Sequence, residues 1–236
     1  FGRVAQSTRD HERELRRRLD QLAALGQVAH VLTSAEGAQR TMEFVASQGM
    51  RVYGAERCGV LLIDPATGKM ECPVAVGVSA RYVDAVTELF AALPAVPRLL
   101  AGEAIFLEDA PNLPGSPLAP VAAAEGFASM AALPLVYTGE PIGVLAFMHD
   151  RPHRWGQAER RIAGAFADQA ALAIGRSRLL DRVTQAKTEW QAVFDAAPSG
   201  LAVLGPDGRI QRANKWIADL AGLEPSALPG LTLTAA

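Results

Sequence analysis

Cysteine is scarce in this chain of 236 residues, since only Cys58 and Cys72 occur. Two cysteines cannot form the dense disulfide framework of small secreted domains, and no apolar leader with a small-residue cleavage site precedes the first predicted helix. This scarcity favours a reducing compartment. We therefore expect a cytoplasmic protein.

A surplus of either charge is missing as well. The 23 basic and 25 acidic residues nearly cancel and leave a formal net charge of -2. Such a balance removes the long-range field that draws a protein onto nucleic acid or anionic lipid. The arginines between Arg13 and Arg18 are therefore interpreted as part of a solvated helix face with mixed charges, and no nucleic-acid partner is expected.

The sequence contains no run of about 20 apolar residues, the length that a bilayer-spanning helix needs. The most apolar stretch, residues 129–148, is interrupted by Pro134 and Pro141. We expect no direct membrane contact in this chain. Because it begins with Phe1 and ends in a strand-like run at 231–234, we expect it to be a segment of a longer polypeptide.

Sequence motifs for catalysis are absent too. Neither the G-x-x-x-x-G-K-S/T phosphate loop nor the G-x-G-x-x-G loop occurs, so kinase and nucleotide-hydrolysis chemistry are not expected within this chain. No Cys-x-x-Cys pair is found. His149 and His153 are four residues apart but fall at a strand end and in a proline-containing loop, not on one helix face. We predict no enzyme activity and no metal site, and the sequence identifies no cofactor.

What the sequence does contain is a high apolar content, 50% of its residues, arranged with clear periods. From Arg9 to Leu32, apolar residues recur at three- and four-residue steps, which predicts a helix with one apolar stripe. Ser34 is the predicted N-cap of a second helix that runs toward Tyr53.

Two extended runs, Arg57–Ile63 and Lys69–Val76, flank a Pro/Gly turn and predict a β-hairpin. In the expected register Leu61 lies across from Cys72, whereas Cys58 lies on the opposite face, which excludes a disulfide. We interpret both cysteines as small buried apolar side chains. A thiol redox enzyme or sensor that uses either of them is a weaker alternative.

The middle of the chain predicts a sheet with an irregular cover. The elements expected there are a helix over 80–93, a strand over 104–108, a loop over 109–120, a short helix over 118–125, and a second hairpin from strands 129–136 and 142–148. The proline- and glycine-rich loop is a natural lid for the sheet. Both strands of the second hairpin are apolar at almost every residue, so both faces of the sheet should be covered.

A long helix with two apolar stripes is predicted from Gln157 to about Ala192. One stripe, which would pack on the sheet, consists of Phe166, Ala170, Ala173 and Ile174. The other has a heptad-like pattern and continues past residue 179, where no domain remains to bury it. We therefore predict a homodimer through the N- and C-terminal helices. Its predicted interface residues are Leu15, Leu19, Leu22, Leu172, Leu179, Val183, Ala186 and Trp190.

Two segments, set in this order of elements, resemble the GAF family. Residues 132–145 (ALPLVYTGEPIGVL) look like the central hairpin of a GAF domain, and residues 167–174 (ADQAALAI) look like its closing helix. The resemblance covers roughly residues 25–174. One departure is Trp155-Gly156, where the family usually has Phe followed by a Thr or Ser cap, and glycine is the weaker cap.

The chain then becomes similar to the start of a PAS domain. Residues 194–214 (FDAAPSGLAVLGPDGRIQRAN) match its short approach helix, apolar strand, Asp-Gly turn, returning strand and helix-opening Asn, and residues 223–230 (LEPSALPG) resemble the turn that follows. The stretch is well short of the roughly 100 residues usual for one domain, so we expect only the first elements of the PAS fold.

These resemblances predict the organisation of the whole chain. We expect an α+β fold with a GAF-like antiparallel sheet flanked by helices, a long helical linker and a partial PAS-like α/β segment. The expected divisions are an N-terminal signalling helix at 1–24, a GAF-like sensor domain at 25–175, a coiled-coil-like linker helix at 176–193 and a truncated PAS-like domain at 194–236.

The resemblance implies the sensory input module of a bacterial signalling protein, which binds a small ligand and relays the change through dimeric helices to an output domain such as a histidine kinase or a cyclic-dinucleotide enzyme. The Asn-Lys-Phe-Asp-Glu signature of cyclic-nucleotide-binding members is absent, which disfavours that ligand. By analogy with the family, the pocket between sheet and lid would be lined by Tyr82, Phe106, Asp109, Met130, Ala132, Leu145 and Phe147. Core packing is the alternative for each of them, and a structural dimerisation spacer without a ligand is the alternative for the chain.

Overall fold

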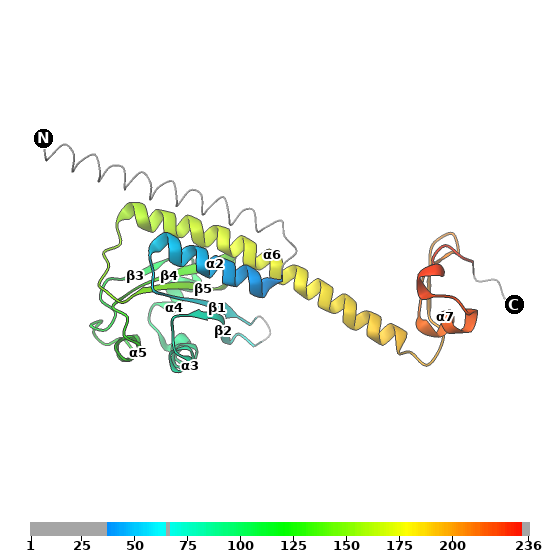
Figure 1. Ribbon diagram of the computed structural model, residues 1–236, viewed down its shortest axis with the longest axis horizontal. Helices are drawn as coiled ribbons and strands as arrows, with labels where there is room; N and C mark the ends of the chain where they lie inside the picture. Colours follow the sequence, from blue (N-terminus) through cyan, green and yellow to red (C-terminus); the bar gives the residue numbers. More distant parts are fainter. Residues whose placement is uncertain (1–36, 65–66, 233–236) are drawn as a thin grey trace, which may run out of the picture. The chain divides into compact units, whose positions relative to one another are not determined.

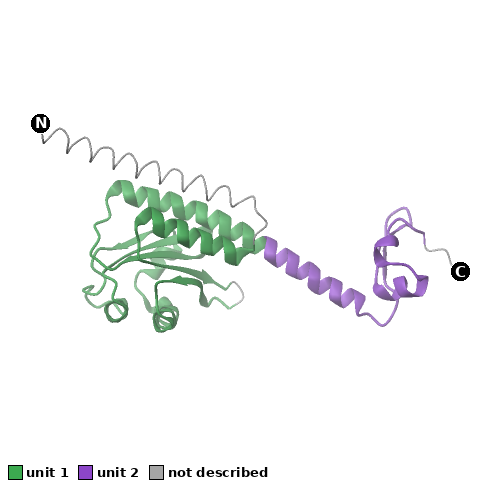
Figure 2. Ribbon diagram, viewed as in Figure 1, with its two compact units in different colours: residues 1–179 green, residues 180–236 purple. Residues whose placement is uncertain are grey.

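The computed structural model describes residues 37–64 and 67–232 (Figure 1). The chain divides into two compact units, residues 1–179 and residues 180–236 (Figure 2). The predicted N-terminal helix, with Leu15, Leu19 and Leu22, lies outside the described residues. Within the part of the chain that is described, no helix combines the length and the apolar composition needed to cross a membrane.

The first unit is built on one antiparallel sheet with the strand order β2-β1-β5-β4-β3. Its strands are β1 (Arg57–Ile63), β2 (Met70–Val76), β3 (Ile105–Leu107), β4 (Ser129–Tyr137) and β5 (Glu140–His149). The two predicted hairpins supply β1 with β2 and β4 with β5, and pairing of β1 with β5 joins them. The predicted α+β fold with a helix-flanked antiparallel sheet is confirmed.

The hairpin of β4 and β5 forms the centre of the sheet. At its turn Thr138 and Gly139 have φ of 51° and 86°, the left-handed conformation that a two-residue hairpin of the primed type requires. Nearly all residues of both strands are buried or half-buried, and most are apolar. Both faces of the sheet therefore need a cover, as the sequence predicts.

Helices supply this cover (Figure 1). On one face lie α2 (Ala38–Tyr53) and α6 (Gln157–Asp195). On the other lie α3 (Ala80–Leu89), the 3-10 turn Phe90–Ala92, α4 (Val96–Leu100) and α5 (Leu118–Glu125). The predicted helical stretch over 80–93 is present as α3 followed directly by the 3-10 turn.

The start of α2 differs from its prediction. The helix begins at Ala38 after Gly37, so the prediction that Ser34 caps it was wrong. Gly37 has no side chain to cap the helix. Instead, Thr41 donates both its backbone N–H and its hydroxyl to the carbonyl of Gly37, at 3.2 Å and 3.4 Å, and so secures the first turn.

Side-chain alternation along β4 and β5 divides the core of the first unit into two layers. The layer beneath α2 and α6 contains Ala131, Leu133, Leu135, Leu145 and Phe147. The layer beneath α3, α4 and α5 contains Met130, Ala132, Val144, Ala146 and Met148. Neighbouring residues of one strand therefore contact different helices.

Helix α6 packs closely on the sheet. Its predicted sheet-facing stripe, Phe166, Ala170, Ala173 and Ile174, is buried in the core, which confirms that prediction. The alanines of this stripe are small, so the helix backbone approaches the strands. The backbone of α6 at Gly175 lies against the ring of Tyr137, because a Cβ on that glycine would lie 2.3 Å from Cγ of the ring.

The second unit contains the end of α6, the two-stranded sheet of β6 (Ala202–Leu204) and β7 (Ile210–Ala213), α7 (Lys215–Ala221) and the 3-10 turn Pro225–Ala227. Asn214 sets its geometry from a fully buried position. Its Oδ1 accepts hydrogen bonds from the backbone N–H groups of Leu201 at 3.0 Å and Ile217 at 3.3 Å, and its Nδ2 donates to the carbonyl of Ser199 at 2.9 Å. The predicted strand, turn, strand and Asn-opened helix are therefore all present.

The last turns of α6 contact this small sheet within the second unit. The guanidinium of Arg212 in β7 lies over the ring of Trp190, 4.6 Å from its centroid, and its Nη2 donates to Oε1 of Gln191 at 3.3 Å. Asp195 Oδ1 accepts from the backbone N–H of Lys215 at 3.0 Å. These contacts tie the end of the long helix to the corner between β7 and α7.

A polar cluster connects the end of β5 to the start of α6. The imidazoles of His149 and His153 stack with centroids 4.6 Å apart, and His149 Nδ1 lies 3.4 Å from Glu56 Oε2 while His153 Nε2 lies 2.9 Å from Glu159 Oε1. Trp155 packs against both rings. Burial, and then the neighbouring His153, hold the pKa of His149 below its ordinary value, against the opposing pull of the two glutamates.

The substitution Gly49→Ala is expected to destabilise the first unit. A Cβ at Gly49 of α2 would lie 2.1 Å from Cζ of Phe147, a fully buried ring, so the core must shift to admit it. Overpacking of this kind lowers the free energy of unfolding by about 1–3 kcal/mol, measurable by urea denaturation. In the control, Gly164→Ala in α6, the new Cβ meets nothing within 4 Å. There, helix propensity should add about 0.5–1 kcal/mol. Equal stabilisation by both substitutions would contradict this packing.

The lowered pKa of His149 predicts a loss of stability in mild acid. The unfolded chain binds a proton on this residue more readily than the folded chain does, so the free energy of unfolding should decrease as the pH falls through about 6.5. His149→Phe keeps a ring but removes the titration. Urea denaturation at pH steps from about 8 to about 5 should give a flatter pH dependence for this variant than for the wild type. Identical slopes would show that His149 does not set this pH dependence.

Candidate ligand-binding site

One ionic network holds α3 and α5 in place on their face of the sheet. Arg57, at the start of β1, contacts Glu125 at the end of α5 at 3.3 Å and Asp150 after β5 at 2.8 Å. The carboxylate of Glu125 accepts from the backbone N–H and hydroxyl of Ser79 at 2.7 Å and 2.6 Å. Ser79 Oγ caps α3 by accepting from the backbone N–H of Tyr82 at 3.1 Å. The network therefore sets where α3 begins and where α5 ends.

A cleft of about 350 Å³ opens between α4, the loop before α5 and the β3 edge of the sheet. Its floor consists of Ile105, Leu107, Met130 and Ala132 from β3 and β4. Its walls include Leu93, Leu99, Leu113 and Leu118. The polar side chains that line it are those of Arg98 and Ser116. A mostly apolar cleft of this size, with a few polar groups, is typical of a small-molecule site.

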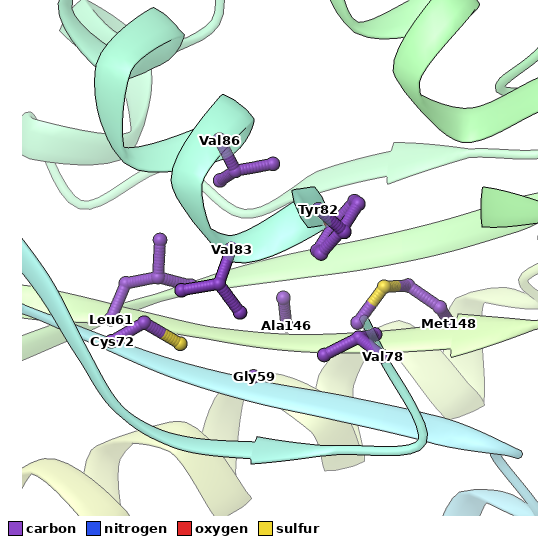
Figure 3. A pocket seen from close by; sticks show the side chains of 9 residues that line it. All are labelled: Gly59, Leu61, Cys72, Val78, Tyr82, Val83, Val86, Ala146 and Met148. Atoms are coloured by element: carbon purple, nitrogen blue, oxygen red, sulfur yellow. The ribbon is translucent and has the colours of Figure 1, made fainter. Parts of the chain in front are cut away.

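Two further cavities lie beside α3. One, of about 250 Å³, lies between α3 and α5, and Ser79, Arg81, Tyr82 and Glu125 are among its lining residues. The other, of about 10 Å³, lies beneath α3, where Cys72, Tyr82 and Met148 point toward it (Figure 3). The latter has room for a single water at most. Of these three spaces, the cleft beside α4 offers the most room for a ligand.

The predicted ligand-binding residues are divided among several places. Met130 and Ala132 line the cleft beside α4. Tyr82 lines the two cavities beside α3 instead. Asp109 is exposed in the loop after β3, where both of its carboxylate oxygens accept from Nδ2 of Asn112 at 3.0 Å. These four residues all lie on the side of the sheet that α3, α4 and α5 cover, but they do not line one pocket.

The other three predicted residues lie on the opposite side of the sheet. Leu145 and Phe147 are fully buried in the core layer beneath α2 and α6, and Phe106 packs against the same layer. The strand register is the reason. Ala132 pairs with Ala146, so Leu145 shares the face of Leu133 and points away from the lid. The expectation that all seven residues line one pocket is therefore corrected.

The cleft also contains residues that the sequence did not single out. Arg98 and Leu99 come from α4, and Leu113 and Leu118 come from the loop before α5 and the start of that helix. Apolar leucines inside a proline- and glycine-rich loop were the available signal, because a loop that only faces water has no need of them.

The two cysteines lie on opposite faces of the sheet, as predicted. Cys58 is fully buried beneath α2 and α6, and burial raises the pKa of its thiol. Cys72 is half-buried on the α3 side, where its Sγ lies 3.3 Å from the carbonyl of Val74 as a donor, and burial raises its pKa as well. A raised pKa lowers the thiolate fraction, which is the reactive form, so this placement does not favour thiol chemistry.

Metal-binding side chains do not converge in the described part of the chain, where no group of three or more His, Cys, Asp or Glu residues has a suitable arrangement. His149 and His153 instead each contact a carboxylate, and they stack on one another. The arrangement can stabilise the start of α6.

The predicted dimerisation residues of α6 are exposed in the single chain. They are Leu172, Leu179, Val183, Ala186 and Trp190. More than half of the surface of Leu179 and Val183 is exposed, 52% and 59%. The N-terminal members of the predicted interface, Leu15, Leu19 and Leu22, lie outside the described residues.

Comparison with known protein families finds a match in each of two parts of the chain. Residues 35–175 match the model of the GAF domain, and residues 188–235 match that of the PAS domain. No curated protein matches the chain. A domain of a protein described as a two-component sensor histidine kinase from Sinorhizobium meliloti 1021 is 30% identical, with a TM-score of 0.52, over 61% of this chain and 94% of that one.

Two solved structures at lower identity show the fold alone. The GAF domain of a phosphoenolpyruvate-protein phosphotransferase from Coxiella burnetii is 20% identical, with a TM-score of 0.59, over 70% of this chain and 98% of that one. A GAF domain/HD domain protein from Geobacter sulfurreducens is 15% identical, with a TM-score of 0.52, over 63% of this chain and 99% of that one.

GAF and PAS domains are sensory domains of signalling proteins and are generally non-catalytic. The GAF model spans more than half of the chain, including the whole sheet and the cleft. The predicted family is therefore confirmed: the chain belongs to the GAF domain family and continues into a PAS-type sequence.

Proposed function

We propose that this chain is the sensory input module of a bacterial signal-transduction protein, which binds a small organic molecule in the cleft beside α4 and relays its occupancy through paired α6 helices. Strand β4 carries the proposal, because its side chains contribute both to the lining of the cleft and to the core layer beneath α6. In β4, Met130 and Ala132 line the cleft, whereas Ala131 and Leu133 belong to the core layer that α6 packs on.

Close packing supports the transmission step. A ligand on Met130 and Ala132 presses on β4, and the interior beneath α6 has few voids that could absorb the movement. Helix α6 is continuous from Gln157 to Asp195, so a shift at its sheet-bound half is carried along its axis. At its end, Arg212 and Lys215 contact Trp190 and Asp195, which couples the helix to the second unit's own elements.

The exposed stripe of α6 supports the dimer. Leu172, Leu179, Val183, Ala186 and Trp190 recur at the three- and four-residue steps of a heptad, with Arg176 as the polar interruption. Exposed apolar side chains in such a pattern are unfavourable in water, and a second copy of the same helix covers them. The likeness to a sensor histidine kinase domain from S. meliloti supports a signalling role for the assembly. A histidine kinase or a cyclic-dinucleotide enzyme is the proposed output.

A structural dimerisation spacer is the second candidate. It is favoured by the small cavity beneath α3, which the chain's own side chains already fill almost completely. The spacer and the sensor share the same α6 contacts and differ only in whether the cleft beside α4 takes a ligand.

Native mass spectrometry of the purified chain distinguishes the two. We expect a dimer that carries a small molecule, which is lost when the same sample is sprayed under denaturing conditions. A dimer of bare chains, before and after incubation with extracts of small metabolites, would favour the spacer. A strictly monomeric species at micromolar concentration would contradict both candidates, because each requires paired α6 helices.

The substitution Val183→Glu is expected to weaken the dimer. It places a charge in the apolar stripe, where pairing would desolvate it, so the dimer dissociation constant measured by analytical ultracentrifugation should rise at least about ten-fold. Thr188→Glu is the matched control, because Thr188 is exposed on the same helix but lies about 200° around the axis from Ala186 and from Trp190. Equal effects of the two substitutions would argue against an interface along this stripe.

A further inference from the structure

The cleft beside α4 has a single charged side chain in its lining, that of Arg98. Among the described residues that line it, the remaining polar side chain is the hydroxyl of Ser116. The cleft thus presents an apolar surface with one cationic point at its α4 edge. A nucleotide or another polyanion would find too few partners for its charges and hydrogen-bonding groups.

Arg98 already holds a carboxylate in a two-point arrangement. Its Nε donates to Glu103 Oε2 at 2.7 Å, and its Nη2 donates to Glu103 Oε1. This fork is the geometry with which a guanidinium binds any carboxylate. Glu103 does not itself line the cleft, but its carboxylate occupies the two Arg98 donors that the acid group of a ligand would need.

The Arg98–Glu103 pair is easily exchanged. Its two side chains are 60% and 53% exposed, so water and salt screen their attraction. The backbone of Glu103 is held separately, since its N–H donates to the carbonyl of Arg98 at 2.9 Å. The glutamate side chain can therefore turn into solvent without unfolding α4. Glu103 has the advantage of being tethered beside Arg98, and a competing carboxylate offsets it by burying an apolar body in the cleft, whereas Glu103 buries none.

We propose that the cleft binds an amphipathic monocarboxylate, whose aliphatic or aromatic body lies on the floor formed by Leu107, Met130 and Ala132 and whose carboxylate replaces Glu103 on Arg98. This inference rests on the proposed ligand-binding role of the cleft and narrows it to a chemical class. A cationic ligand cannot replace Glu103, because it would place a second positive charge beside the guanidinium of Arg98. A neutral one leaves the Arg98–Glu103 pair in place and binds through its apolar body alone.

Isothermal titration of the full 236-residue chain with three matched probes tests the class. Octanoate, octanol and octylammonium share one apolar body and differ in charge. At about pH 7.5 we expect octanoate to bind most tightly, octanol less tightly and octylammonium least. Within the acids, each methylene from hexanoate to octanoate should increase the affinity about four-fold, because each is removed from water in the cleft.

Substitutions at the two paired residues should act in opposite directions. Arg98→Gln is expected to weaken octanoate about two- to five-fold, the range for an ion pair on so exposed a guanidinium, and to leave octanol unchanged. Glu103→Gln removes the competing charge and should tighten octanoate. Arg81→Gln is the control, since Arg81 lines the neighbouring cavity between α3 and α5 and should alter neither affinity. Leu107→Trp fills the floor and should weaken all three probes, with an unchanged circular dichroism melt as evidence of folding.

The outcomes separate this inference from the function on which it rests. Equal binding of octanoate and octanol, unaffected by Arg98→Gln, would overturn the carboxylate inference while leaving the cleft as a ligand site. Tightest binding of octylammonium would overturn it as well. If none of the three probes binds, the proposed ligand class, an amphipathic monocarboxylate, is wrong. The native mass spectrum then tests the sensory function by itself. A retained small molecule would support that function, and bare chains would contradict it.

Discussion

Both faces of β4 and β5 must be buried, and the arrangement of the helices follows from this requirement. Successive side chains of a strand point to opposite faces, so a strand that is apolar at every position needs two covers. Helices α2 and α6 form one cover, and α3, α4 and α5 form the other. Because Met130 and Leu133 belong to the same strand, only that strand and the side chains on its two faces separate the cleft from the long helix.

The two covers are held in different ways. Helix α6 packs through small residues such as Ala170 and Ala173, so its contact with the sheet is continuous and close. On the other face, α4 spans only Val96–Leu100 and β3 only Ile105–Leu107, and the ionic network of Arg57 fixes α3 and α5 instead. The cleft lies beside these short elements. Local opening costs least where few backbone hydrogen bonds and buried contacts must break, which suits a region that admits a ligand.

Much of the fold could be predicted from the sequence because its signals are local. The hairpins follow from apolar runs around Pro/Gly turns, and α6 follows from a period that continues without proline from Gln157. The Asn214 cap and the Asp-Gly turn of the second unit are also local features, and both occupy their predicted places. The start of α2 was misjudged because Ser34 is a good cap by type, whereas the helix begins after Gly37 through contacts of Thr41.

The candidate site was predicted only in part, for a physical reason. Met130 and Ala132 were found because they belong to a strong hairpin. Leu145 and Phe147 were assigned to the same pocket although the pairing of Ala132 with Ala146 places them on the other face. Which face each side chain occupies depends on the register between the two strands, and the apolar pattern of a single strand does not determine that register. The contribution of Arg98 depends on how α4 folds over the sheet, a non-local arrangement with no signature in the sequence.

We propose that occupancy of the cleft changes how two α6 helices pair. Double electron–electron resonance between nitroxides at Thr188→Cys, in a chain with Cys58→Ala and Cys72→Ala, measures this pairing from the side of the helix away from the apolar stripe. We expect one distance between the labels of two copies, and a shift of that distance when octanoate or the co-purified molecule saturates the cleft. No distance between copies, or the same distribution with and without ligand, would contradict it.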